Sequence, residues 1–211
     1  MAAFISLNIK AKLALLGITL LIILLVAGFS PLERTLGSNI RLVYVHGAWV
    51  WAGQLAYAGA ALAGLFGLLV QPAWHGWSQA LGWTGLFFWW TYLPMSVLVM
   101  QMNWGGIFWS EPRFQTPLAF GIAGLLLQAG LWVIGSPRLN SAANFIYGVV
   151  LWGVLRSLTN VLHPDSPIAD SGSLRIQFFF VALLLLAVIL GAQLAVLFKG
   201  NSPTVDQINK S

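Results

Sequence analysis

The chain has 211 residues, of which 59% are hydrophobic and 7% are charged, with a formal net charge of +5. Soluble domains carry about a quarter charged residues, so this composition excludes a soluble domain and indicates an integral membrane protein. The absence of cysteine excludes disulfides, thiolate catalysis and cysteine-ligated metals, and the basic residues are too dispersed for a nucleic-acid-binding patch.

Six apolar stretches follow one another along the chain. A hydrocarbon core of about 30 Å takes roughly 20 helical residues. None of the stretches shows the period-two alternation of a membrane β-barrel, so each is predicted to be a helix. The sequence therefore predicts an all-α integral membrane protein with six transmembrane helices. The predicted ranges are 11–30, 43–70, 79–101, 114–135, 142–163 and 175–198.

The first stretch follows Lys10 and Lys12, as the apolar core of a signal peptide would. It is long for such a core and five further stretches follow, so we interpret it as a retained helix. We see no internal repeat in the sequence. Residues 1–200 are expected to form a single six-helix transmembrane domain, and residues 201–211 a short polar C-terminal tail.

The basic residues give a small bias for orientation. With the N-terminus inside, five basic residues flank the inner helix ends and four flank the outer ends. The sequence thus favours a multi-pass protein of the cell inner (plasma) membrane, with a cytoplasmic N-terminus. The inner group is Lys10, Lys12, Arg138, Lys199 and Lys210, and the outer group is Arg34, Arg41, Arg113 and Arg175.

The order of the helices predicts that two histidines lie on the same side of the membrane, and this prediction does not depend on the orientation of the protein. His46 starts the second stretch and His163 ends the fifth, while the connection 102–113 joins the third stretch to the fourth. Successive helices alternate in direction, so all three share one face. His75 lies in a connection on the other face and is interpreted as structural.

The connection 102–113 reads MNWGGIFWSEPR and is predicted to be a tryptophan-rich outward loop. Two imidazoles beside such a loop indicate a flat aromatic ligand, most naturally haem, whose iron commonly takes imidazole as an axial ligand. His46 and His163 are the predicted ligands. Arg113 and Arg41 are placed to pair with the two haem propionates, since a guanidinium binds a carboxylate bidentately.

Arg156 stands about two turns inside the predicted fifth helix, where a charge is costly and usually functional or paired. It precedes His163 by seven residues, so the two share a helical face with Thr159 and Asn160. This polar stripe either lines a ligand-binding cavity or marks an arginine that extends to the membrane boundary.

Three segments, RLVYVHGAWVW, MNWGGIFWSEPRF and NVLHPDSPI, together resemble the CcmC family of haem-handling proteins in cytochrome c maturation. That family has six transmembrane helices, a histidine at the outer start of helix 2, another after helix 5, and an outward "WWD" segment between helices 3 and 4. The resemblance covers residues 40–175 and implies haem b, held non-covalently at rest or in transit. The implied binding residues are His46, His163, Trp104, Gly105, Trp109, Glu111, Arg113 and Arg156.

The central segment departs from the family pattern W-G-x-x-W-x-W-D-x-R. Trp104, Gly105 and Arg113 match it, and Glu111 stands in place of the aspartate. Two tryptophans of the pattern are replaced and one is shifted by a residue, so the chain resembles a divergent member. The altered positions are Phe108, Trp109 and Ser110.

Three classes of function remain open from the sequence. The leading one is a haem chaperone or delivery protein rather than an enzyme, because no nucleotide-binding loop, catalytic triad or carboxylate pair is visible. The altered motif favours a second class, a structural subunit of a larger bioenergetic complex that lost haem transfer. A small-solute transporter is the third, although the sequence has no duplicated half. The resemblance implies as partners other cytochrome c maturation membrane subunits, an ABC-type ATPase complex and a haem-acceptor chaperone.

Overall fold

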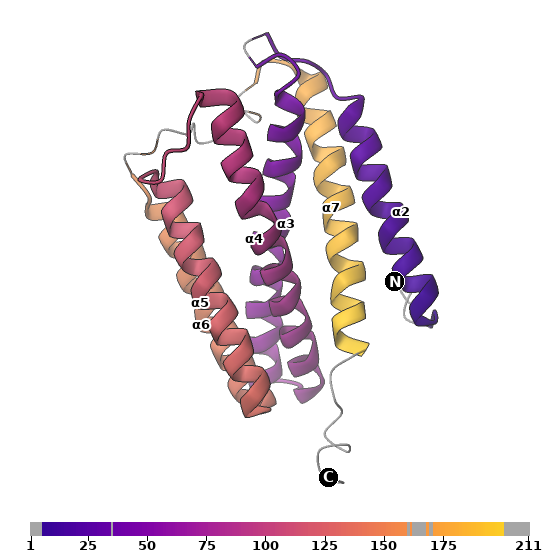
Figure 1. Ribbon diagram of the computed structural model, residues 1–211. Helices are drawn as coiled ribbons and strands as arrows, with labels where there is room; N and C mark the ends of the chain where they lie inside the picture. Colours follow the sequence, from indigo (N-terminus) through magenta and orange to yellow (C-terminus); the bar gives the residue numbers. More distant parts are fainter. Residues whose placement is uncertain (1–5, 35, 160, 162–167, 169–170, 201–211) are drawn as a thin grey trace.

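The computed structural model describes residues 6–34, 36–159, 161, 168 and 171–200, and these form a helical bundle (Figure 1). Helices that follow one another along the chain run in opposite directions, and the start of the first helix and the end of the last lie at the same end of the bundle (Figure 1). The elements are α2 (Ile9–Gly28), α3 (Ile40–Leu69), the 3-10 turn η1 (Pro72–Trp74), α4 (His75–Trp104), α5 (Pro112–Ile134), α6 (Pro137–Ser157) and α7 (Leu174–Gly200).

The all-α prediction is confirmed for the described residues, which contain no β-structure beyond one isolated bridge. In the part of the chain that the structure describes, four helices are long and apolar enough to cross a membrane, namely α2, α3, α5 and α7. The other two long helices are less apolar for different reasons. Five tryptophans lie in α4, and α6 buries polar side chains inside the bundle.

Local sequence explains where several helices begin and end. Asn8 caps α2 by accepting a hydrogen bond from the Ala11 amide at 2.9 Å, and Ser136 caps α6 in the same way at 3.4 Å. Gly105 and Gly135 follow the ends of α4 and α5 with φ of 72° and 67°. This left-handed conformation favours glycine and terminates each helix.

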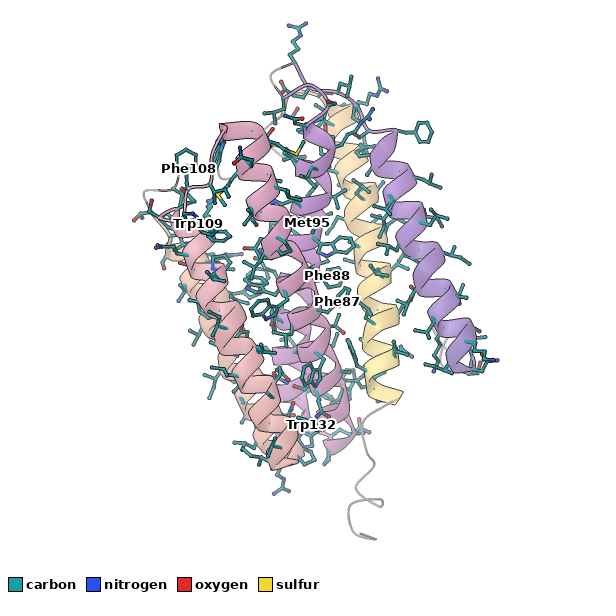
Figure 2. All side chains as sticks on the ribbon, viewed as in Figure 1. Phe87, Phe88, Met95, Phe108, Trp109 and Trp132 are labelled. Atoms are coloured by element: carbon teal, nitrogen blue, oxygen red, sulfur yellow. The ribbon has the colours of Figure 1, made fainter. Side chains whose placement is uncertain are left out.

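The centre of the bundle is α3, which packs against α4, α6 and α7. Small residues allow the close approach: a Cβ on Gly64 would lie 2.5 Å from the Ser141 carbonyl oxygen of α6. Phe88 of α4 fills the space between Gly53 of α3 and Gly191 of α7 (Figure 2). By contrast, α2 lies at the edge beside α7 (Figure 1) and buries few side chains.

The two ends of the bundle carry different residues, and we name them after their histidines. The His46 end holds the starts of α3, α5 and α7 and the ends of α2, α4 and α6. The His75 end holds the opposite termini. The prediction that His46 and the α4–α5 connection share an end is therefore confirmed, with His75 at the other end.

The prediction that a helix continues to residue 163 is wrong, because α6 ends at Ser157. Leu158 adopts an extended backbone with ψ of 127°, and the Ser157 hydroxyl donates to the Val154 carbonyl at 2.9 Å. That side-chain bond satisfies one of the carbonyls left unpaired at a helix end. Arg156 therefore lies in the last turn of α6, and the continuous polar helical stripe does not form.

Candidate ligand site at the His46 end

His46 lies in the second turn of α3, and its half-buried ring faces α4. Its Nε2 is 2.8 Å from the hydroxyl oxygen of Ser96, and its ring centre is 5.4 Å from that of Tyr92. The imidazole is therefore held between two helices rather than projecting into solvent. Whether Nε2 donates or accepts this hydrogen bond depends on the tautomer.

The aromatic connection is shorter than the sequence indicated. Trp104 is the last residue of α4, so the prediction that places it in the loop is wrong, and the connection consists of residues 105–111. Trp104 meets Phe108 edge to face at 5.7 Å, and Trp109 meets Phe114 of α5 at 5.6 Å. Figure 2 shows Phe108 and Trp109 together beside the start of α5.

Trp109 is the tryptophan of this region that a ligand can reach most readily, because its side chain is 60% exposed. Gly105 precedes it in a left-handed turn, and a Cβ there would meet nothing within 4 Å. The requirement for glycine at this position therefore comes from backbone conformation and not from crowding.

Glu111, one of the predicted binding residues, lies at the start of α5. Its side chain is 3% exposed, and its carboxylate accepts a hydrogen bond from the backbone amide of Arg113 at 3.4 Å. Glu111 thereby caps α5, where the helix dipole favours a negative charge. The carboxylate thus fixes the backbone that carries the Arg113 side chain.

The α6–α7 connection also reaches the His46 end. A Cβ on Gly47, next to His46, would lie 3.9 Å from Ile168 and 3.1 Å from the Phe180 ring of α7. Ile168 therefore packs beside the start of α3. The second predicted iron ligand, His163, lies outside the described residues, as does Asn160 of the predicted polar stripe.

Arg156 is exposed at the end of α6, and its guanidinium lies 5.3 Å from the ring centre of Trp152. This is a cation–π contact between residues one turn apart. The prediction of an arginine two turns inside a membrane helix is wrong because the helix ends earlier. Arg156 nonetheless belongs to the same end of the bundle as His46.

A buried polar cluster inside the bundle was not found from the sequence. Asn144 of α6 is its centre and accepts a hydrogen bond from Gln128 of α5 at 2.6 Å. It also donates hydrogen bonds to Asn140 at 2.8 Å and to the Ser78 carbonyl of α4 at 3.1 Å. The i, i+4 spacing of Asn140 and Asn144 on an otherwise apolar helix was the available signal. This cluster joins α4, α5 and α6 toward the His75 end.

Comparison of the chain with protein-family models, curated proteins and solved structures finds no match. Within the described ranges, no three histidine, cysteine, aspartate or glutamate side chains are grouped so that they could hold a metal ion. A haem iron held by two axial imidazoles does not require such a group.

Proposed function

We propose that this protein is a membrane haem-handling protein that binds haem b at the His46 end and presents it for cytochrome c maturation. The observation that carries the proposal is the gathering of His46, the 105–111 connection and Ile168, which lies between α6 and α7, at one end of the bundle. The resemblance of these same three segments to the CcmC family supplies the identity of the ligand.

The residues at this end fit haem in part. Trp109 offers an exposed aromatic face, and Arg113, at the start of α5, supplies a cation at the bundle end for a propionate. His46 is the candidate ligand whose position is described, and an iron bond through Nε2 would require release of the Ser96 hydroxyl. When bound, haem would supply the redox-active iron, and the chain would orient it and cover its apolar edge.

Six membrane spans form part of this proposal. The alternation of six long helices supports it, as does the burial of the polar side chains of α6 within the bundle, away from lipid. We place the protein in the cell inner membrane with its N-terminus cytoplasmic and the His46 end outside. The other cytochrome c maturation subunits, an ABC-type ATPase complex and a haem-acceptor chaperone are the proposed partners.

The orientation can be tested by single-cysteine labelling, because the chain has no native cysteine. Trp109→Cys should react with a membrane-impermeant thiol reagent in intact cells, and Arg138→Cys should react only after permeabilisation. Both parent side chains are exposed, at opposite ends of the bundle. The reverse pattern would overturn the orientation.

Haem binding itself is tested by the haem-to-protein ratio and the reduced visible spectrum of protein produced with ample haem. We expect the parent to carry haem, and His46→Ala and His163→Ala to lose it or become five-coordinate. Trp104→Ala should mainly speed haem loss. A haem-free parent would overturn the proposal of a resting ligand, and unchanged spectra in both histidine variants would overturn the axial ligands.

One feature favours the second candidate function, a structural subunit of a larger bioenergetic complex. His46 is hydrogen-bonded to Ser96, and Glu111 caps α5, so both side chains already have internal structural roles. Purification in mild detergent distinguishes the two functions. A stable assembly with fixed stoichiometry and no haem bound by this chain would favour the subunit, whereas a haem-loaded chain favours the chaperone.

A further inference from the structure

Two adjoining cavities lie at the His75 end, away from the proposed haem site. One has a volume of about 490 Å³, and its lining includes Gly67, His75 and Arg138. The other is an apolar groove of about 620 Å³ along α3 and the start of α4, lined by Gly59, Phe66 and Trp74 among others. Both volumes fall within the range of about 300–1,000 Å³ that is usual for small-molecule sites.

The two cavities form one continuous surface. Leu69 and Val70, at the end of α3, line both of them. The combined surface therefore has a polar part where the helices end and an apolar part that runs along the bundle. A ligand that fills it must itself have a polar head and an apolar chain.

The polar part is positively charged. Arg138 is exposed in the first turn of α6, and α4 and α6 both begin here with no acidic residue in the first turn. Lys199 lies near the same helix starts, with its ammonium 4.1 Å from the Trp77 ring centre. The acidic residues that the structure describes, Glu33 and Glu111, are both at the His46 end, in the α2–α3 and α4–α5 connections.

His75 adds a polar ring to this charge. Its side chain is 8% exposed and lines the cavity, and its Nδ1 is 2.7 Å from the Ser141 hydroxyl oxygen. That contact fixes the ring at the wall of the cavity. A buried imidazole and an exposed guanidinium thus contribute to the same cavity.

We propose that this surface binds one anionic glycerophospholipid of the membrane leaflet at the His75 end. Its phosphate meets Arg138 and His75, and one acyl chain lies in the groove beside Gly59 and Phe66. A charged head at the helix ends and an apolar chain along the membrane-facing surface match the two parts of the site. This inference rests on membrane insertion and is independent of haem binding.

The test is the amount of phosphatidylglycerol that co-purifies with the protein from nanodiscs of equal phosphatidylglycerol and phosphatidylcholine, measured by native mass spectrometry. We expect the parent to be enriched in phosphatidylglycerol, and Arg138→Gln to lower the retention about fivefold through loss of one basic contact. Lys10→Gln is the matched control, since it removes one exposed charge at the same end but outside both cavities.

Gly59→Leu tests the apolar part of the site. A Cβ at this position would meet Leu81 at 3.4 Å, an ordinary contact, so the variant should fold while its side chain fills the groove. It should retain less phosphatidylglycerol, with an unchanged melting temperature in detergent. Parent-like retention by both Arg138→Gln and Gly59→Leu would overturn the proposal, as would an equal loss in Lys10→Gln.

Two further measurements identify the class of ligand. Equal retention of phosphatidylcholine and phosphatidylglycerol by the parent would overturn the preference for an anionic head. Inorganic phosphate, added to delipidated protein, should raise the melting temperature less than phosphatidylglycerol does. Equal stabilisation by the two would overturn the lipid and indicate a free-phosphate site.

Discussion

Two histidine–serine pairs bridge neighbouring helices, one toward each end of the bundle. His46 of α3 meets Ser96 of α4 at 2.8 Å, and His75 of α4 meets Ser141 of α6 at 2.7 Å. The hydrogen bonds are alike, but their surroundings differ. His46 is half-buried at the end that carries the aromatic connection, whereas His75 is buried against Gly67, where a Cβ would lie 2.7 Å from its Nδ1.

This difference shows that a hydrogen bond alone does not distinguish a histidine fixed by packing from a candidate iron ligand. His75 lies beside close helix contacts and near the buried cluster around Asn144, so movement of its ring would disturb several contacts. Near His46, a Cβ on Gly47 would meet the edge of the Phe180 ring and a methyl group of Ile168 rather than backbone. The His46 ring is therefore better suited to exchange its partner for an iron, whereas the His75 ring is held in one position.

The largest expected effect comes from separating the helices at the His75 end. Gly64→Ala would place a Cβ 2.5 Å from the Ser141 carbonyl oxygen, a backbone atom that cannot rotate away. We expect a loss of about 1–3 kcal/mol in unfolding free energy, typical of overpacking. Thermal or denaturant unfolding in detergent measures it. Gly153→Ala on α6, with nothing within 4 Å of the added Cβ, is the control and should be neutral or slightly stabilising.

A smaller effect is expected from removing the centre of the polar cluster. Asn144→Leu would leave Gln128, Asn140 and Ser78 without a shared partner in the core. We expect a loss of about 1–2 kcal/mol, since interhelical hydrogen bonds in membrane proteins average about 0.6 kcal/mol each. The same unfolding assay checks it. Parent-like stability of Asn144→Leu would mean that the cluster does not join the three helices energetically.

The smallest expected effect is the loss of stability when the serine of each histidine–serine pair is removed. Ser141→Ala should destabilise the protein by about 1 kcal/mol or more, because it leaves the buried His75 Nδ1 unsatisfied. Ser96→Ala should cost less, because the half-buried His46 can find water. If His46 binds iron, Ser96→Ala should also retain haem at least as well as the parent. A larger stability loss for Ser96→Ala would reverse the comparison of the two ends.

Much of the fold followed from the sequence because hydrophobic length is a strong signal. Each of the six predicted ranges overlaps a long helix, with the largest disagreement at the end of α6. The end of α6 depends on the local backbone turn after Arg156, and the hydrophobicity of the sequence does not indicate where that turn begins. The side of the bundle on which His46 and the aromatic connection lie followed from helix alternation alone.

The contacts of the site were less predictable, because they depend on tertiary neighbours. Ser96 becomes the partner of His46 only because α3 and α4 pack antiparallel at that level. Glu111 occupies the position of a motif acid, yet its carboxylate caps α5. Asn144 and Gln128 are separated by a helix connection, so their direct hydrogen bond could not be inferred from spacing.

The polar interior of α6 has a consequence for how the chain enters a membrane. Asn140, Ser141 and Asn144 are buried in the finished bundle. In the proposed six-span arrangement, these side chains would face lipid on an isolated α6. Insertion of this helix by itself is therefore unfavourable, and it should remain near the translocation machinery until α4 and α5 are beside it. A truncation after α6 should still integrate, whereas α6 fused alone to a reporter should partition poorly into the bilayer.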